Sequence, residues 1–508
     1  MPSATIIVDN DFVIDKVSPR LFGSFVEHLG RAVYGGIYEP GHPTADDNGF
    51  RQDVLALVRE LGVTVIRYPG GNFVSGYRWE DGVGPKGTRP RRRDLAWTST
   101  ESNRFGTDEF IDWCRAAKVE PMLAVNLGTR GPAEAGDYYE YCNHPKGTAL
   151  ADLRKANGHA QPHDVTLWCL GNEADGPWQM GQKPADEYGR QSREATKLMT
   201  APDLNRPLHG SVKNEFIVCG SSGRAMSSYG HWDQAVLEEC FEKVDYLSVH
   251  SYISPNKIDI PTFLAFADTT MANLIDEVTA ICDAVAAKRK SPKRIHLSYD
   301  EWNVWYFNPD PPHEPFAEAP CLLEDKYTLA DALCVGAMMI TLLNHCDRVK
   351  IACLAQLVNV IGPIMTRTGG PAWRQTTFYP FADGARFGQG TVLRQVVQTP
   401  TYKVADDLVG LLSSCVIRND DGAVTLFALN RDLENALDLN VDLRSFAPLS
   451  LAAWTVLDGP DLLAINTEAE PDKVKPHSQT GGQLANNRLT LQLPKASWNV
   501  IRLQARPS

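Results

Sequence analysis

The sequence contains no apolar run long enough to cross a membrane. Its most apolar region, residues 329–365, is interrupted at residues 344–348 by polar and charged side chains and again by Gln356, Asn359 and Gly362. A membrane-spanning helix needs about 20 consecutive, predominantly apolar residues, and neither half of this region supplies them. We therefore expect a buried helix followed by a buried strand here, and no membrane partner.

The sequence also lacks the signatures of disulfide-rich, zinc-binding and secreted proteins. Its 11 cysteines are scattered singly, without a CxxC pair or a Cys/His cluster at zinc-binding spacing. No basic stretch followed by an apolar stretch occurs in residues 1–15, so we expect no secretory signal. Free thiols and the missing signal together predict a cytoplasmic location.

Positive charge is in deficit, since the formal net charge is −12. This balance argues against nucleic acid as the main partner and fits a neutral substrate better. With 508 residues, of which 43% are hydrophobic, the chain can bury a large core and is expected to hold more than one domain.

The first three-quarters of the chain alternates short apolar, strand-like runs with helical patterns. This alternation is typical of βαβ units and a parallel sheet. Eight such units in succession favour a (β/α)8 TIM barrel, placed at residues 18–386, over an open doubly wound sheet. The first strand is not followed by GxGxxG, which weakens a dinucleotide-binding alternative. The predicted strands are 21–27, 64–68, 122–127, 166–170, 216–219, 246–250, 295–299 and 351–357, and the predicted helices include 52–61, 108–117, 184–199, 271–289 and 325–344.

After residue 387 the pattern changes to short β-rich runs without long helical periodicity. Turn sequences at residues 419–422 and 481–482 separate them. We predict a C-terminal antiparallel β-sandwich, or jelly roll, over residues 387–508. Residues 4–8 and 12–14 precede the barrel, and we expect residues 1–17 to join this second domain.

Two glutamates, Glu173 and Glu301, each end a strand-like apolar run. By count they close strands 4 and 7 of the barrel, and the C-terminal ends of barrel strands converge on the face where catalysis occurs. A glycosidase that retains configuration needs one carboxylate nucleophile and one carboxylic acid about 5 Å apart. The pair therefore predicts an enzyme that cleaves glycosidic bonds, and Asn172 beside Glu173 is placed to bind a ring hydroxyl.

Four motifs, at residues 23–31, 66–73, 168–173 and 300–303, occur in order at predicted strand ends. With them the chain resembles the glycoside hydrolase family 51 α-L-arabinofuranosidases over nearly its whole length. The resemblance implies that Glu173 is the acid/base and Glu301 the nucleophile. It implies exo-acting release of terminal arabinofuranose, with retention, from arabinan, arabinoxylan or derived oligosaccharides. It also suggests a homo-oligomer, often a hexamer, and the chemistry requires no metal or organic cofactor.

The same resemblance assigns further roles around the two glutamates. Hydroxyl-binding roles fall to Glu27, Asn72 and Asn172, and Gln356 is implied to touch the sugar. Tyr252 is implied to hydrogen-bond the nucleophile, Arg67 to hold nearby carboxylates, and Trp97 and Trp302 to wall the pocket, because sugar C–H faces pack well on aromatic rings.

Several of these residues also have plain structural interpretations. Glu173 and Glu301 could each be a helix-start carboxylate, Glu27 could pair with Arg67 at the rim, and His250 is as well read as a satisfied core group as a substrate contact. Gly70 and Gly71 are expected to supply positive φ in a tight turn. Trp178 could stack on an aglycone sugar or lie in the core. A salt-bridged loop is preferred over an acidic-substrate site for Arg89, Arg91, Arg92 and Arg93, and residues 308–320 form either a lid or an oligomer contact.

Other functions remain as alternatives at this stage. The same mechanism could act on another glycan, as in a β-xylosidase or an endo-β-glucanase. A metal-dependent barrel hydrolase would use His28, His250 and aspartates, but no HxH or HExxH motif supports it. A non-catalytic sugar-binding protein would have no need for both glutamates.

Overall fold

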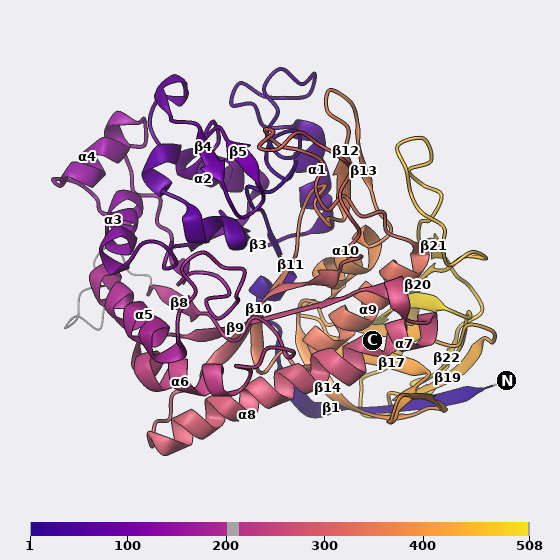
Figure 1. Cartoon of the computed structure of the whole chain (residues 1–508). Helices are drawn as coiled ribbons and strands as arrows, with labels where there is room; N and C mark the ends of the chain where they lie inside the picture. Colours follow the sequence, from indigo (N-terminus) through magenta and orange to yellow (C-terminus); the bar gives the residue numbers. More distant parts are fainter. Residues whose placement is uncertain (1, 201–212, 506–508) are drawn as a thin grey trace.

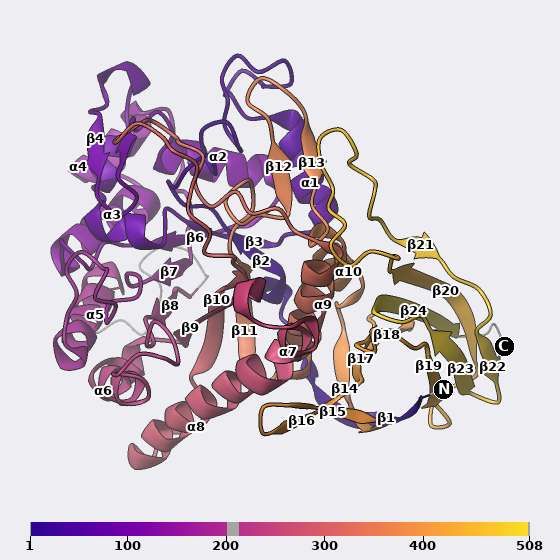
Figure 2. The same ribbon diagram turned by 45° about the vertical axis from the view of Figure 1, so that its right-hand side comes forward.

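A closed barrel of eight parallel strands forms the larger part of the protein, as predicted. The computed structural model describes residues 2–200 and 213–505. Each barrel strand is hydrogen-bonded to the next one in the closed ring (Figures 1 and 2). In chain order the barrel strands are β2 (Gly23–Phe25), β3 (Val65–Tyr68), β6 (Glu120–Ala124), β7 (Leu167–Cys169), β8 (Glu215–Val218), β9 (Tyr246–Ile253), β10 (His296–Val304) and β11 (Val349–Leu354).

The barrel interior is filled by apolar side chains, so it is a packed core and not a pore. Inward-facing residues of successive strands form one buried cluster, which includes Phe25, Val65, Met122, Ile217 and Ile351. Polar side chains are therefore accommodated above this cluster, at the C-terminal ends of the strands.

Helices surround the barrel. They are α1 (Gln52–Leu61), α2 (Thr107–Ala117), α3 (Pro132–Asn143), α4 (Ala149–Ala156), α5 (Ala185–Thr200), α6 (His231–Cys240), α7 (Ile260–Phe266), α8 (Ala272–Lys288), α9 (Leu329–Asn344) and α10 (Phe378–Phe387). Within residues 2–200 and 213–505, no helix combines the length and apolar character that a membrane crossing requires.

Helix α9 explains the most apolar region of the sequence. Residues 329–343 are all buried, because α9 contacts barrel strand β10 on one side and strands of the second domain on the other. The predicted buried helix followed by a buried strand is confirmed, with β11 as the strand.

The second domain is one ten-stranded sheet that curls over on itself. Strands β20 and β22 stand near opposite ends of the strand order, yet they contact each other, and both halves of the sheet share one apolar core. The predicted sandwich is thus confirmed, with two layers that belong to a single sheet. The order is β21 (His477–Ser478), β20 (Leu449–Leu457), β24 (Ser497–Ala505), β18 (Val424–Asn430), β17 (Leu412–Arg418), β14 (Thr391–Gln398), β1 (Ser3–Lys16), β19 (Leu437–Asp442), β23 (Arg488–Leu493) and β22 (Gln483–Ala485).

Both ends of the chain contribute to this sheet. Strand β1 lies between β14, to which it is antiparallel, and β19, to which it is parallel. Figure 2 shows β1 crossing to the sheet domain beside β14. The domain limits themselves stay a prediction.

Three short hairpins complete the described strands. They are β4 (Arg92–Asp94) with β5 (Ser99–Glu101), β12 (Ile364–Thr366) with β13 (Ala372–Arg374), and β15 (Thr401–Val404) with β16 (Asp407–Gly410). The first of these lies near the C-terminal mouth of the barrel and carries Trp97 in its turn.

Candidate active site

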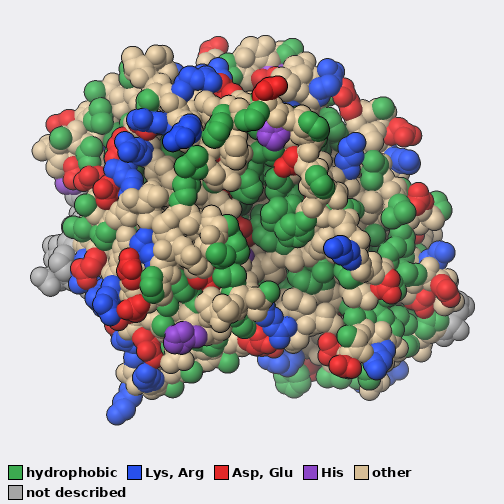
Figure 3. Space-filling view, viewed as in Figure 1, with side chains coloured by type: hydrophobic (Ala, Val, Ile, Leu, Met, Phe, Trp, Pro, Cys, Tyr) green, Lys and Arg blue, Asp and Glu red, His purple; other side chains and the backbone are tan. Residues whose placement is uncertain are grey.

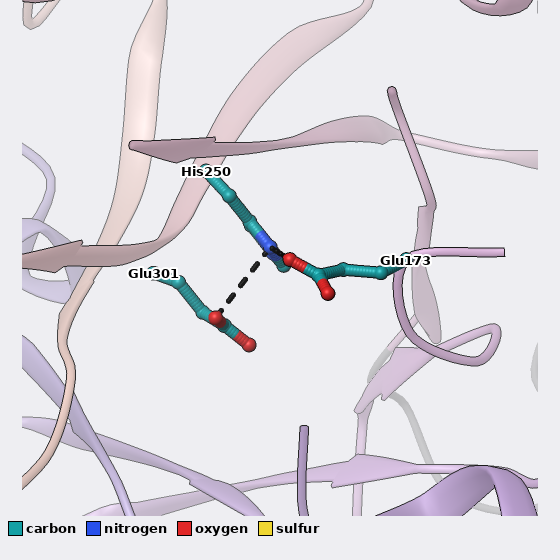
Figure 4. A group of neighbouring side chains, drawn as sticks. All are labelled: Glu173, His250 and Glu301. Carbon is teal, nitrogen blue, oxygen red and sulfur yellow. Dashed lines mark hydrogen bonds and ion pairs between the residues drawn. The ribbon is translucent and has the colours of Figure 1, made fainter. Parts of the chain in front are cut away.

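The structure brings Glu173 and Glu301 together at the mouth of the barrel. Glu173 follows β7, the fourth barrel strand, and Glu301 lies in β10, the seventh. One oxygen of each carboxylate and Nδ1 of His250 all lie within 4.8 Å of one another (Figure 4). A sugar carbon placed between the carboxylates is therefore within reach of both.

Glu301 is held by two donors. Arg67 Nη1 donates to Oε1 at 2.6 Å, and the Tyr252 hydroxyl donates to Oε2 at 2.7 Å. Burial alone would lower the pKa of Arg67, but the charges of Asp300 and Glu301 raise it well above its usual value. Both contacts fix the orientation of the Glu301 carboxylate.

Glu173 also has one donor on each oxygen. His250 Nδ1 lies 2.9 Å from Oε1, and the Trp178 indole Nε1–H donates to Oε2 at 2.7 Å. The backbone φ of Glu173 is 41°, in a region that residues other than glycine rarely adopt and that is common at active sites. Trp178 is 53% exposed, so the core interpretation of Trp178 is wrong.

His250 bridges the two glutamates. Besides Glu173 it lies 3.6 Å from Glu301 Oε2, and its Nε2 lies 3.1 Å from Asp300 Oδ1. Burial lowers the pKa of His250, but the charge of Glu301 and hydrogen bonds with Asp300 and Glu173 outweigh it and raise the pKa to about 10. A positively charged ring donates from both nitrogens, which suits carboxylates on either side.

Glu27 occupies a separate buried position in the pocket. It accepts hydrogen bonds from the Phe73 backbone N–H at 2.8 Å, Trp97 Nε1 at 3.0 Å and Gln356 Nε2 at 3.2 Å. Burial, the main cause, raises the pKa of Glu27 to about 8. The ion pairs of Arg67 among the described residues are with Asp300 and Glu301, so the predicted alternative of a Glu27–Arg67 pair is wrong.

The backbone of Gly71 lies directly against the Glu27 carboxylate, where a larger side chain would not fit. A Cβ atom on Gly71 would lie 2.5 Å from Glu27 Oε2. Gly71 has a φ of −13°, and the φ of Gly70 is not positive either. The expected positive φ at Gly70 and Gly71 is therefore wrong, and close approach to a carboxylate is the reason for glycine at position 71.

Asn72 and Asn172 are joined in one hydrogen-bond chain with Arg67. Arg67 Nη2 donates to Asn172 Oδ1 at 2.6 Å, and Asn172 Nδ2 donates to Asn72 Oδ1 at 3.3 Å. Gln179 Nε2 also donates to Asn72. These hydrogen bonds fix the side-chain orientation of both asparagines.

A cavity of about 400 Å³ lies between these groups. Figure 3 shows hydrophobic side chains gathered around a hollow near the middle of one face of the molecule. The cavity is lined by carboxylates, amides and many apolar side chains, a combination that suits a sugar ring. Its lining includes Glu27, Asn72, Trp97, Glu173, Trp178, Tyr252, Glu301, Trp305, Phe307, Leu323 and Gln356.

Trp302 does not wall this cavity, so that prediction is wrong. Its side chain is fully buried, and its ring stacks 6.4 Å from that of Phe381 in α10. Successive residues of a strand point to opposite faces, so Glu301 faces the cavity and Trp302 faces the helix layer. Trp305 lines the cavity instead.

Comparison with known proteins agrees with this geometry. Residues 57–258 match the family model described as "Alpha-L-arabinofuranosidase 1 domain", and residues 300–497 match "Alpha-L-arabinofuranosidase C-terminal domain". An "Intracellular exo-alpha-(1->5)-L-arabinofuranosidase" of Streptomyces lividans is 51% identical over 99% of this chain and 75% of its own length. This chain belongs to family 51 of the α-L-arabinofuranosidases.

Two further relatives extend the comparison of this family 51 chain. An "Exo-alpha-(1->6)-L-arabinofuranosidase" of Bifidobacterium longum is 47% identical over 99% of this chain and 98% of its own. The solved structure of AbfB, a family 51 α-L-arabinofuranosidase from the same organism, is 44% identical, with a TM-score of 0.92 over 99% of each chain.

The arginine cluster of this family 51 chain is largely neutralised. Arg89 pairs with Glu109 at 2.9 Å, Arg91 with Glu318 at 2.8 Å and Arg92 with Asp81 at 2.8 Å. The preferred prediction of a salt-bridged loop is confirmed for these three. The segment 308–320 packs on the β4–β5 hairpin through backbone hydrogen bonds to residues 98 and 100.

His28 does not join His250 in a metal site. Its Nδ1 lies 2.7 Å from Glu101 Oε2, and its Nε2 lies 2.7 Å from the Tyr68 hydroxyl. Both ring nitrogens are thus engaged in buried contacts, and the proposed ligand set of the metal-dependent alternative is not assembled.

Sequence reasoning missed three residues of the site. Asp300 supports His250, Gln179 supports Asn72, and Trp305 lines the cavity. Asp300 stands inside a motif that was recognised, and its adjacency to Glu301 was the available signal. Gln179 belongs to an irregular loop whose path carries no periodic pattern.

Proposed function

We propose that this protein is a retaining, exo-acting α-L-arabinofuranosidase that releases terminal arabinofuranose from arabinan, arabinoxylan or derived oligosaccharides. The observation that carries the proposal is the separation of Glu173 and Glu301, whose nearest oxygens lie within 4.8 Å. Carboxyl groups about 5–5.5 Å apart are typical of retaining enzymes, whereas inverting enzymes leave about 6.5–9.5 Å for a water molecule.

In the first step Glu301 is the nucleophile. Its carboxylate attacks the anomeric carbon while Glu173 gives a proton to the departing glycosidic oxygen, so the leaving group departs as a neutral alcohol. Arg67 and Tyr252 hold the Glu301 carboxylate in a fixed orientation. The product of this step is an arabinosyl ester of Glu301.

In the second step Glu173 acts as a base. Esterification removes the negative charge of Glu301, and Glu173 then takes a proton from water while the water oxygen attacks the anomeric carbon. The ester bond to Glu301 breaks, and two inversions give net retention. The positive charge of His250 stabilises Glu173 whenever it is ionised.

Recognition of the arabinofuranosyl ring is assigned to polar groups that line the cavity and to Asn172, which hydrogen-bonds the cavity-lining Asn72. We assign hydroxyl contacts to Glu27, Asn72, Asn172 and Gln356, and an apolar wall to Trp97 and Trp305. The relatives' names support exo action, and they differ in linkage, (1->5) in one and (1->6) in another. The name of the Streptomyces relative also supports a cytoplasmic location, and a homo-oligomer remains a prediction.

Hydrolysis of an aryl α-L-arabinofuranoside, followed by NMR, tests this function. We expect rapid hydrolysis and first formation of the α-anomer of arabinose. A β-anomer as first product contradicts the retaining mechanism. A folded sample that fails to hydrolyse the glycoside between pH 4 and 9 contradicts the substrate class.

A further inference from the structure

The two oxygens of Glu173 are held by donors of very different character. On Oε1 the donor is Nδ1 of His250, whose side chain is buried. On Oε2 it is the indole N–H of Trp178, 2.7 Å away on a side chain that is 53% exposed. The inner oxygen is therefore fixed by the barrel, while the outer oxygen depends on a partner at the surface of the cavity.

The Trp178 hydrogen bond favours one protonation form of Glu173. An N–H donor on a carboxylate oxygen stabilises the charged form and opposes protonation. Under the proposed function, on which this inference rests, Glu173 must carry a proton in the first step and accept one in the second. The bond therefore assists the second step and hinders the first.

We propose that Trp178 is a positioning residue of the acid/base carboxylate: its indole N–H donates to the outer oxygen of Glu173 while the cavity is empty and turns away when a leaving group occupies the cavity. Trp178 lines the same cavity as Glu173 and Glu301, so a leaving group in the cavity meets the indole directly.

The Trp178 indole packs against the backbone of Gly176. A Cβ atom on Gly176 would lie 2.7 Å from Cε2 of Trp178, so the ring packs against the backbone at Gly176. The Gly176 N–H donates to the Glu173 carbonyl at 2.8 Å, which closes the turn that carries both residues. Gly176 has no positive φ, so alanine fits its backbone conformation. The added methyl group displaces the indole, while neither Glu173 nor Trp178 is itself substituted.

The test is the pH dependence of kcat/KM for a small aryl α-L-arabinofuranoside in Trp178→Phe and Gly176→Ala. Phenylalanine keeps an aromatic face and loses the N–H. In both variants we expect the basic limb of the profile to move up by about 0.5 pH unit or more, because the proton on Glu173 is retained to higher pH. We also expect a larger pre-steady-state burst of aryl alcohol, because the second step slows.

Phe307→Leu is the matched control. Phe307 is 55% exposed and lines the same cavity without a polar group, so its loss should raise KM and leave the basic limb in place. A basic limb that stays in place in both Trp178→Phe and Gly176→Ala overturns the inference. If azide still rescues Glu173→Ala in that case, the proposed function stands and the positioning role of Trp178 alone is lost.

Discussion

At the scale of single residues, the site consists of carboxylates with different surroundings. Glu301 faces Arg67 and Tyr252, Glu173 faces His250 and Trp178, and Glu27 is enclosed by neutral donors. Opposite charge and hydrogen bonding favour an ionised group, while burial without a charged partner favours a protonated one. Differences of this kind divide acid, base and binding roles among residues of one type.

Substitution of Glu173 by alanine separates its role from that of Glu301. The variant should lose most activity on natural substrates, by about 10²–10⁴-fold, yet retain the first step for substrates with good leaving groups. Azide should then accelerate turnover and give the α-azide, because a small anion enters the space left by the carboxylate and displaces the Glu301 ester in a second inversion. A β-azide, or full activity without azide, would contradict the assignment.

Glu27 supplies a prediction about pH and stability. Burial raises its pKa in the folded protein to about 8, so the folded state binds a proton that the unfolded state has lost above about pH 4.5. Wild-type stability should therefore decline, through this group, as pH rises from about 4.5 to 8. In Glu27→Gln that contribution is absent.

The measurement is the midpoint of thermal unfolding at pH 5 and pH 9. Relative to wild type, the unfolding midpoint of Glu27→Gln should be higher at pH 9 than at pH 5. Glu434→Gln, at an exposed position of the sheet domain, is the control and should show no such increase. A constant difference for Glu27→Gln would show that Glu27 is ionised throughout this range.

The residue scale also shows where sequence reasoning fails. The positions of Glu173, Glu301, Glu27 and Asn72 followed from motifs at strand ends. Trp302 was misplaced because a motif gives no direction for a side chain, and the alternation along β10 turns it away from the cavity. Gln179 and Trp178 reach the site through a loop, whose course depends on contacts remote in sequence.

At the scale of elements, periodicity located all eight barrel strands and the main helices. Helix α1 has the predicted limits, residues 52–61. Strand β10 continues beyond the predicted end to Val304, because its last residues pair with the extended end of β9. Periodicity alone does not indicate strand β17, because Ser413 and Ser414 interrupt its apolar run although both are buried in the sheet.

Helix α9 offers a test of how the two domains pack. A Cβ atom on Gly336 would lie 2.7 Å from the Trp498 ring in β24. Alanine improves helix propensity by about 1 kcal/mol, but overpacking of a filled core costs about 1–3 kcal/mol. We expect Gly336→Ala to lower the thermal unfolding midpoint, and Gly336→Ala combined with Trp498→Phe to recover part of it. A higher midpoint for the single variant would refute close packing at this contact.

At the scale of the whole molecule, the barrel and the sheet domain are linked by α9 and by strand β1. The first residues of the chain complete a sheet whose other strands come from the last quarter. Composition change along the sequence is enough to suggest two domains. It does not predict that the two layers of the second domain are one continuous sheet, because strand order depends on long-range pairing.

Neighbouring isoleucines in β1 test this arrangement. Ile6 is fully buried in the core of the sheet domain, whereas Ile7 is 45% exposed on the opposite face. Ile6→Ala should lower the free energy of unfolding of the sheet domain by about 2–5 kcal/mol, and Ile7→Ala by much less. Equal effects in denaturant titrations of the two variants would contradict the place of β1 inside the sheet.

The central claim is that Glu301 forms a covalent bond with the sugar while Glu173 serves both steps. Mass spectrometry of Glu173→Ala, quenched after mixing with an aryl α-L-arabinofuranoside that has a good leaving group, tests it directly. We predict one arabinosyl group on the peptide that contains Glu301, removed when azide is added. Release of the aryl alcohol with no adduct, or an adduct on another residue, would contradict it.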